Sequence, residues 1–523
     1  MKISGRSVNT LNGAVSIFVS KLEHSARSRF PLVWALLLLV VVSFTMLWLG
    51  DKLNASGMAL TRFMARAQAP LTAQFHYPAL MRDQITVLLY DREFLNNSGS
   101  AWPISYREHA DGLLRLVSDP KARPKAIFLD ITFGQERDDP TVSILNQTLC
   151  RIQNEFRIPI FLAAMPSPED GHLSIRSGLG TGQAGNAPAC FTLVGVDYLP
   201  DPLDGLAWSY ALSRHLTDAG WVSGPASEPL NQPAYRSAAM ALAQDVAQLD
   251  LGEETVPMAL MWGHNSAPQT HRPERLYHCR PGVRDFGQLV PGVLRQIWED
   301  GDQLPLCPYH QTLSMAQLGV LSEEELAPYL AGRYLLVGAS IPGYNDFADS
   351  PVHRITPGIH MHAMALDNLL TYGGDYKLSS EWTLPPSWAL LKPGLLAILV
   401  VFLVHLAWDK LQEKLVRIYR ANGWPSACMP PLVWYLKQPE RIRRLLGLAA
   451  GVLAWLSRLS LQTIIVMVAI AFLQTYFRIG MLPVVELVGM TLLAEGLGYV
   501  KKIQALLNAS GSSPVHASQA RLF

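Results

Sequence analysis

Long apolar stretches occur four times in this chain, and each is long enough to cross the hydrocarbon core of a membrane as a helix. They cover residues 30–50, 388–408, 461–477 and 481–500. The first has no charged residue and no small-residue cleavage pattern after it, so we expect a retained anchor and not a signal peptide. The pattern predicts four transmembrane helices, with an interfacial or re-entrant helix over about 445–457.

Between the first two apolar stretches, short apolar runs alternate with helical patterns. The clearest runs are 85–90, 126–129, 158–163 and 333–337. Such near-continuous apolar runs are typical of parallel strands that are buried on both faces. Leucine and isoleucine at three- and four-residue spacing predict helices over 106–117 and 142–155, and an alanine-rich segment predicts another over 236–249. Residues 51–386 are therefore expected to form an α/β domain with a mainly parallel sheet flanked by helices.

Charge is sorted along the chain. Residues 1–29 contain five Lys or Arg against one Glu, whereas residues 51–386 contain 24 Lys or Arg against 36 Asp or Glu. The loop 409–460 and the tail 501–523 are again basic. Because cytoplasmic loops carry an excess of Lys and Arg, we expect a multi-pass protein of a bacterial inner membrane. Both termini and the basic loop are then cytoplasmic, and the acidic domain is periplasmic.

The composition excludes several classes of protein. Charged residues make up 16% of the chain and hydrophobic residues 49%, against roughly 25% charged residues in a typical soluble domain. A wholly soluble enzyme, a disordered chain and a nucleic-acid-coating protein do not fit these values. The sequence also has no G-x-S-x-G elbow, no H-E-x-x-H helix and no phosphate loop ending in G-K-[ST]. We expect no enzymatic activity, no cofactor and no nucleic-acid partner.

Four of the five cysteines fall within residues 51–386, and only Cys428 falls in a predicted cytoplasmic loop. An even number of cysteines in an oxidising compartment permits two disulfides. Their order along the chain suggests the pairs Cys150–Cys190 and Cys279–Cys307, although three pairings are possible. A zinc site is the alternative, because His278 and His310 lie beside the second pair, but no C-x-x-C pair is present. We therefore predict no metal.

Two aspartates follow predicted strands directly. Asp91 comes after the first strand and Asp130 after the second. Open parallel sheets bind ligands at the carboxyl ends of their strands. Together with Asp346, these residues are expected to form an acidic cluster for a cation or a polar ligand. The alternative is that each aspartate caps the next helix or satisfies a turn.

His360 and His362 lie two residues apart, directly after Pro357-Gly358. This dipeptide suggests a loop that leads into a helix, where the two side chains would point to different faces. Hydrogen bonding that stabilises the fold is the simpler expectation for both histidines. A buried histidine here is also a candidate pH sensor, because its ordinary pKa is near 6.5.

A set of motifs recurs in a defined order along residues 85–372. The motifs are a strand ending at Asp91, Trp102-Pro103 before Arg107, a strand ending at Asp130, the pair Asp204-Gly205, and the run 332–340 that continues through Asp346 and Pro351 to 357–370. This order resembles the second subtype of the CHASE family, the cyclase/histidine-kinase-associated sensory extracellular domains. One predicted span before the domain and three after it are also similar to that family.

The resemblance implies a sensory domain outside the cytoplasm. We take its motif residues as candidate ligand-binding residues: Asp91, Trp102, Arg107, Asp130, Asp346, His360 and His362. Members of the family usually carry a cyclase, kinase or diguanylate cyclase domain after the last span, whereas only 23 residues follow Val500 here. We therefore expect the output to pass through a separate partner protein.

The predicted spans contain charged residues, which are costly in lipid and tend to pair. We expect Glu495 to pair with Arg458 near the cytoplasmic face. Glu486 is expected to pair with Arg478 or Lys392 near the outer face. The alternative for the basic residues is snorkelling to the interface, which does not serve the glutamates.

Three functions fit these observations. The first is a non-enzymatic inner-membrane protein whose periplasmic sensory domain signals to a separate inner-membrane or cytoplasmic partner. The second is a structural or assembly subunit of an envelope-spanning secretion, conjugation or polysaccharide-export complex. The third is a periplasmic enzyme of unrecognised type. The first two imply a homo- or hetero-oligomer in contact with the lipid bilayer, and residues 1–29 are expected to form an amphipathic helix or a solvated segment.

Overall fold

The computed structural model describes residues 77–379 with gaps, together with Ala73 and positions 414, 439 and 442. The gaps are 181–189, 199, 202–204, 218–219, 225–232, 253–256, 269–278, 281–305, 342 and 344–345. All elements below belong to one of two compact units, the one formed by Arg62–Trp382 and Ala471–Leu482. Within these described ranges, no helix has the length and apolar character to cross a membrane. The four predicted spans lie outside them.

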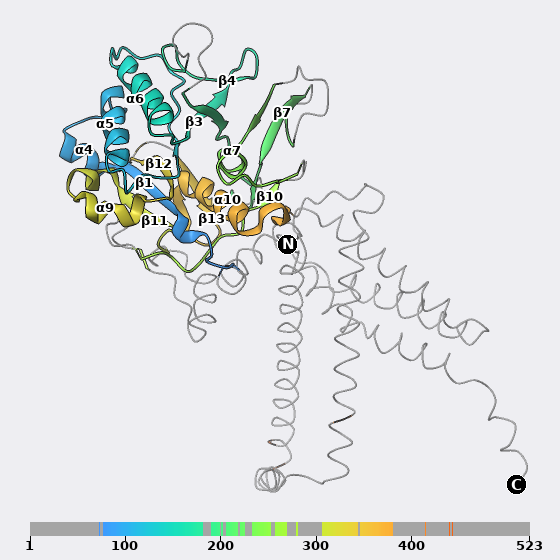
Figure 1. The fold of residues 1–523 in the computed structure, drawn as a ribbon. Coiled ribbons are helices and arrows are strands. Elements are labelled where there is room, and N and C mark those ends of the chain that lie inside the picture. Colours follow the sequence, from blue (N-terminus) through green and yellow to red (C-terminus); the bar gives the residue numbers. More distant parts are fainter. Residues whose placement is uncertain are drawn as a thin grey trace, which may run out of the picture. The chain divides into compact units, whose positions relative to one another are not determined.

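A seven-stranded, largely parallel sheet forms the centre of the domain (Figure 1). Its strands follow the order β11-β1-β12-β2-β3, and β3 also pairs with β4 and β5. Only the β3–β4 pairing within this sheet is antiparallel. The strands are β1 (Ile85–Asp91), β2 (Ala126–Leu129), β3 (Ile160–Pro166), β4 (Leu173–Ser174), β5 (Thr192–Gly195), β11 (Gln311–Ser314) and β12 (Tyr334–Ser340). The mainly parallel sheet predicted from the sequence is confirmed.

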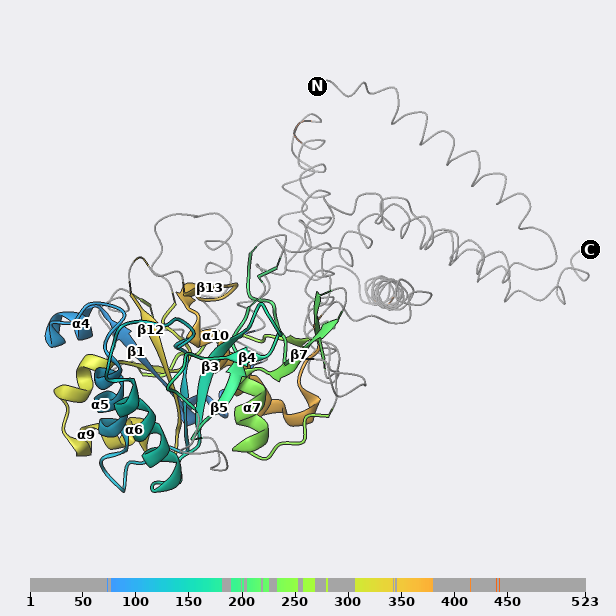
Figure 2. The same ribbon diagram turned by 90° about the horizontal axis from the view of Figure 1, so that it is seen from above.

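Helices cover both faces of the sheet (Figures 1 and 2). One face carries α5 (Tyr106–Val117), α6 (Val142–Asn154) and α9 (Glu323–Leu330). The other face carries α7 (Ala238–Asp245) and α10 (Ile359–Tyr372). The other helices in the described ranges are α4 (Arg92–Ser98) and the 3₁₀ helices η1 (Arg82–Gln84), η3 (Met315–Gly319) and η4 (Gly373–Asp375). The domain is therefore a three-layer α/β structure.

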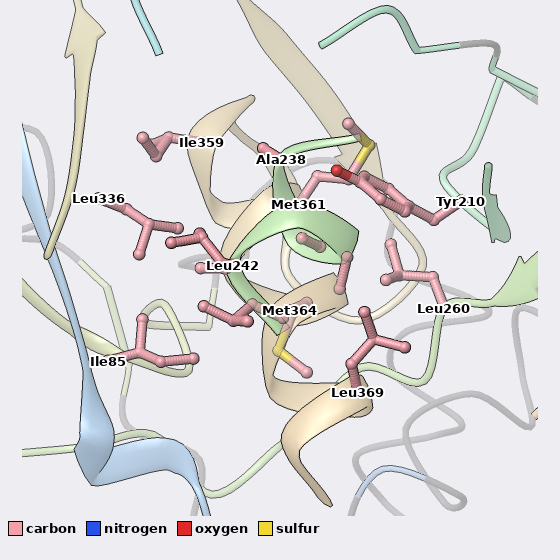
Figure 3. Close-up of a cluster of buried hydrophobic side chains, with 14 of the residues drawn as sticks. Ile85, Tyr210, Ala238, Leu242, Leu260, Leu336, Ile359, Met361, Met364 and Leu369 are labelled. Atoms are coloured by element: carbon pink, nitrogen blue, oxygen red, sulfur yellow. The ribbon is translucent and has the colours of Figure 1, made fainter. Parts of the chain in front are cut away.

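Successive side chains of a strand point to opposite faces of a sheet, and this alternation divides the interior into two cores. In β12, Tyr334 and Leu336 belong to the core under α7 and α10, whereas Leu335 and Val337 belong to the core under α5, α6 and α9. Figure 3 shows the first core, with labelled side chains from the sheet, α7 and α10: Ile85, Leu336, Ala238, Leu242, Ile359, Met361, Met364 and Leu369. Because both faces are covered, the inner strands β1, β2 and β12 are buried along their whole length.

Helix α10 crosses the sheet at close range. Gly338 of β12 faces its first turn, and a β-carbon at position 338 would lie 3.0 Å from Cβ of Ile359. Every residue from Ile359 to Leu369 is buried. The polar side chains in this run are therefore removed from water and need partners within the protein, since an unpaired buried polar group is costly.

Short antiparallel strands extend the domain beside the central sheet. They are β6 (Ser209–Tyr210) with β10 (Met258–Ala259), β7 (Ser213–Thr217) between β8 (Gly220–Ser223) and β9 (Ala234–Arg236), and the hairpin β13 (Phe347–Ser350) with β14 (Arg354–Pro357). Gly358 joins this hairpin directly to α10. The hairpin therefore fixes where the first turn of α10 begins.

Most predicted elements appear close to their expected bounds, and the differences have local causes. Strand β3 begins at Ile160 and not at 158, because Pro159 has no backbone N–H to pair. Helix α7 is shorter than the expected 236–249, because Arg236 belongs to β9 and Ser237 caps the helix. Strands of two to five residues, such as β6 and β10, carry too little periodicity to be recognised in the sequence.

Both suggested cysteine pairs lie at disulfide distance. Cys150 of α6 is bonded to Cys190 just before β5, and Cys279 is bonded to Cys307 just before β11. The first bridge therefore connects a helix to the edge of the sheet, and the second closes the segment 280–306. The zinc alternative is not adopted at Cys279 and Cys307, because their sulfur atoms are bonded to each other.

Replacing Leu336 by alanine tests the core between β12 and α10. The side chain is completely buried, so Leu336→Ala should lower the free energy of unfolding by about 2–5 kcal/mol through lost contacts and a residual cavity. Val320→Ala is the control, because Val320 is 69% exposed; it should change stability by less than about 0.5 kcal/mol. Thermal unfolding of the purified chain measures both, and equal effects would contradict this description of the core.

Candidate functional site

Asp91, the last residue of β1, and Asp130, directly after β2, lie at the carboxyl edge of the sheet, with β12 between these strands. Asp91 is level with Ser340 of β12, and the backbone N–H of Asp130 donates to the carbonyl of Val337 at 2.8 Å. By alternation from Phe128, the side chain of Asp130 points to the face covered by α7 and α10. The first turn of α10 lies on the same face, next to Gly338.

Asp130 is the buried carboxyl group at this edge. Its side chain is only 8% exposed, and one oxygen lies 3.9 Å from Nε2 of His362 on α10. That oxygen, Oδ2, has no hydrogen-bond partner among the described residues. Removal from water raises the pKa of Asp130 to about 7, because the charged form loses its hydration. The carboxyl group therefore retains its proton into the neutral pH range.

His362 connects Asp130 to a tyrosine. Its Nδ1 lies 2.7 Å from the hydroxyl of Tyr210, the last residue of β6. Burial lowers the pKa of His362 to about 4, an effect that the charge of Asp346 partly opposes. The imidazole is therefore neutral above this pH. Its ring is also in edge-to-face contact with Phe128 at 5.7 Å and with Tyr210 at 5.6 Å.

The hydrogen bonds of Tyr210 define the tautomer of His362. Burial raises the pKa of Tyr210, so the phenol keeps its proton, while Ser237 and the backbone of Ala239 donate to its oxygen. The Tyr210 hydroxyl then donates to Nδ1 of His362, which places the ring proton on Nε2. This proton faces Asp130. A polar chain thus runs from the first turn of α7 through Tyr210 and His362 to Asp130.

Asp346 lies at the solvent side of this group. The residue is exposed, and its backbone carbonyl accepts a hydrogen bond of 3.0 Å from Gly358 N. Partial burial of its carboxyl group, followed by the nearby charge of Asp130, raises the pKa of Asp346 to about 7, while His362 opposes the shift. Gly358 lies directly beside Oδ1 of Asp346, so a β-carbon at position 358 would displace that carboxyl group. We name Asp130, Asp346, His362 and Tyr210 the carboxyl-edge cluster.

The carboxyl-edge cluster can bind a proton, a cation or a hydrogen-bonding ligand. Two carboxyl groups that influence each other hold protons more strongly than isolated ones, since two adjacent negative charges repel. A bound cation would reverse this effect and favour both ionised forms. Across the described ranges, no group of three or more His, Cys, Asp or Glu side chains is arranged to hold a metal ion. Two carboxyl groups of raised pKa beside a neutral imidazole suit protons and small polar or cationic molecules.

Asp91 caps a helix, which is the alternative to ligand binding that the sequence left open. Its carboxylate accepts a hydrogen bond from the backbone of Phe94 at 3.0 Å and one from the hydroxyl of Ser314 at 2.8 Å. The first of these caps the N-terminus of α4. Of the three aspartates in the predicted acidic cluster, Asp130 and Asp346 are electrostatically coupled.

Trp102 and Arg107 lie on the opposite face of the sheet from Asp130. Trp102 precedes a cis peptide bond to Pro103 and packs on Tyr90 and His109 in the second core. Arg107 is exposed on α5, and its backbone N–H donates to Thr141. Neither residue joins the carboxyl-edge cluster, and their roles in ligand binding stay predictions.

His360 is buried near other histidines and not near Asp130. It is 3% exposed, and neither ring nitrogen has a hydrogen-bond partner within the described part of the chain. Burial lowers the pKa of His360 to about 3, with smaller contributions from His310 and His353. The hydrogen-bonding role expected from the sequence is therefore not seen for His360, whereas His362 does have a hydrogen bond.

Several polar residues were missed by the sequence analysis. Tyr210 belongs to a two-residue strand and carried no recognisable signal. Asp367 did carry one, because an aspartate inside an apolar helical run, two turns after His360, is unusual and needs a partner. The predicted intramembrane pairs Arg458–Glu495 and Arg478–Glu486 lie outside the described residues.

One comparison with known proteins gives a match. A family model described as the CHASE2 domain matches residues 35–407. No curated protein and no solved structure matches the chain. The matched range is more than half of the sequence, and it includes the whole carboxyl-edge cluster and all candidate ligand-binding residues.

Replacing Asp130 by asparagine tests its raised pKa. Because the native pKa of about 7 exceeds the ordinary 3.8, the Asp130 carboxyl binds more protons in the native state, and its contribution to wild-type stability falls as the pH rises from about 4 to 7. Asp130→Asn cannot ionise, so its stability gain over wild type should grow across this range and level off above pH 7. The pKa shift sets an upper bound of about 4 kcal/mol on the gain.

Thermal unfolding of the purified chain at pH 4 to 8 measures this difference. Asp138→Asn is the matched control, because Asp138 is exposed; its stability should follow wild type at every pH. A constant difference between Asp130→Asn and wild type across the range would contradict the assignment.

Proposed function

The chain belongs to the CHASE2 domain family, and from this premise we propose that it is a membrane-anchored sensor that passes a signal to a separate partner protein. The family consists of extracellular sensory domains. The acidic charge of residues 51–386 and the two bonded cysteine pairs also support a position of this domain outside the cytoplasm. We place the α/β domain in the periplasm of a bacterial inner-membrane protein with four spans and cytoplasmic termini.

One observation supports the sensory role most strongly: α10 connects the carboxyl-edge cluster to the end of the domain. Near its start, His362 faces Asp130 of the sheet. After its last residue, Tyr372, the chain passes through η4 to Leu378 and continues to the span predicted at 388–408. A change at the cluster therefore acts on the helix that leads towards the membrane.

The proposed mechanism is a shift of α10 relative to the sheet. In the unliganded state, His362 is neutral above about pH 4 and Asp130 keeps its proton up to about pH 7, so between these values no charge is buried between them. A cationic ligand, or a rise in pH, would ionise the carboxyl groups and change the interaction between β2 and α10. Such a ligand shifts the equilibrium only by its difference in affinity for the two states.

We propose that the receiving partner is another inner-membrane or cytoplasmic protein. The basic segments 1–29, 409–460 and 501–523 are the parts of the chain available to it on the cytoplasmic side. The competing proposal is a fixed structural subunit of an envelope complex. The two differ in whether the association with partners depends on the carboxyl-edge cluster.

Cysteine labelling tests the proposed topology. Asp250 is exposed, so Asp250→Cys in a Cys428→Ser background should react with a membrane-impermeant maleimide in intact cells. The internal control is Cys428 of the wild-type chain, which lies in the predicted cytoplasmic loop and should react only after the membrane is opened. Labelling of position 250 that also requires an opened membrane would rule out the periplasmic placement.

Quantitative co-purification separates the sensor from the scaffold. The tagged full chain is isolated from native membranes in mild detergent, and the amount of each associated protein per chain is measured by mass spectrometry. For a sensor, Asp130→Asn and His362→Gln should change this ratio at equal chain abundance, whereas Asp138→Asn should not. The same ratio in all four proteins would favour the fixed scaffold over the sensor.

A further inference from the structure

The first and last parts of the described domain meet in a buried hydrogen-bond network. Tyr77, near the first described residue, donates its hydroxyl proton to Oδ1 of Asp367 on α10. His310 lies just before β11, and its Nε2 is 3.0 Å from Oδ2 of the same carboxylate. Tyr77 and Asp367 are 290 residues apart in the sequence. Asp367 has no solvent exposure, and His310 and Tyr77 are at most 3% exposed.

The next residue of α10 strengthens this connection. Asn368 donates from Nδ2 to the hydroxyl of Tyr77 at 3.2 Å and to the carbonyl of Met261 at 2.9 Å. Its Oδ1 accepts from the backbone N–H of Met261 at 3.0 Å. Thr371, one turn further along, donates to Asp367 at 3.2 Å. The carboxylate of Asp367 is thus surrounded by donors from three separate parts of the chain.

The surroundings of Tyr77 keep it in its donor form. Its ring is in edge-to-face contact with Tyr309 at 5.7 Å and with Tyr372 at 6.1 Å. Burial, followed by the charge of Asp367, raises the pKa of Tyr77 well above its ordinary value. The phenol therefore stays protonated. Removing one donor from a buried carboxylate is far more costly than removing an exposed ion pair, because the remaining charge loses compensation.

We propose that Tyr77, Asp367 and His310 form a clamp that fixes the start and the end of the domain to each other. The signal then leaves the domain as a joint movement of both chain ends and not as a change in their separation. The joint movement rests on the proposed sensory function, whereas the clamp itself rests on the hydrogen bonds described above. The chain preceding Tyr77 leads back to the predicted span 30–50, and the chain following α10 leads to the span 388–408.

Spin-label distances in the full chain test the clamp. The labels are placed at Leu80→Cys, beside the start of the domain, and at Asp375→Cys in η4, with Cys428→Ser to remove the free thiol. Leu80 is 68% exposed and Asp375 is exposed, so both accept a label. A second pair on α5 and α6, Asp111→Cys with Asn154→Cys, reports whether the fold is intact; both positions are exposed.

The clamp variants are Tyr77→Phe, Asp367→Asn and the milder His310→Gln. The matched control is Tyr235→Phe, because Tyr235 also donates to an aspartate, Asp197, at 2.6 Å, but away from the two chain ends. We expect a single narrow distance between positions 80 and 375 in wild type and in Tyr235→Phe. In the clamp variants this distance should broaden and lengthen, while the α5–α6 distance stays unchanged.

Two results would overturn the proposal. One is a narrow, unchanged distance in Tyr77→Phe and Asp367→Asn with an intact fold; if either fails to fold, His310→Gln decides. The other is a changed 80–375 separation in Asp130→Asn, because the carboxyl-edge cluster should not move the two ends apart. None of these measurements needs the ligand or the partner. If the co-purification test fails, the proposed sensory function is therefore rejected. The distance between positions 80 and 375 should still be fixed and should still depend on the clamp.

Discussion

The burial of α10 is the constraint on which the rest of the domain depends. The helix lies against a sheet that is covered on both faces, and Gly338 of β12 allows it to approach closely. No residue from Ile359 to Leu369 is exposed. Apolar side chains at these positions stabilise the domain, but His360, His362, Asp367 and Asn368 lose their hydration in the same place. An unpaired buried polar group is costly. The protein supplies hydrogen-bond partners for His362, Asp367 and Asn368, whereas His360 has none among the described residues.

The two ends of α10 meet this requirement in different ways. Near the C-terminal end, Asp367 accepts hydrogen bonds from Tyr77, His310 and Thr371, so its charge is well compensated. Near the N-terminal end, Asp130 has an oxygen without a hydrogen-bond partner among the described residues, and its pKa is raised instead. A compensated carboxylate is suited to hold two parts of the chain together. A carboxyl group that titrates near neutral pH is suited to respond to a ligand or a proton, and we assign the two roles accordingly.

The sequence predicted the architecture better than the polar networks. Long apolar strands such as β1 and β12 and amphipathic helices such as α5 have periodicities that depend only on local positions, and these predictions are confirmed. The sequence also placed Asp130 at the carboxyl edge of a parallel strand. It did not identify Tyr210 or Tyr77, and it named His310 only as a zinc-ligand candidate, because the partners of these residues lie far away in the chain and depend on which faces meet. The role of Asp91 could not be decided from the sequence either, because an aspartate at the end of a strand is typical both of a helix cap and of a ligand-binding residue.

Between the sheet and α10, Asp130 keeps its proton well above the ordinary carboxyl range and loses it only at about pH 7. Infrared spectroscopy of the full chain across a pH titration measures this directly, since a protonated carboxyl group has its own C=O stretching band. We predict a band that disappears with a midpoint at about pH 7 and that is weaker in Asp130→Asn, where Asp346 alone still contributes to it. A carboxyl spectrum that titrates only near the ordinary value of about 4, with no difference between the two proteins, would contradict it.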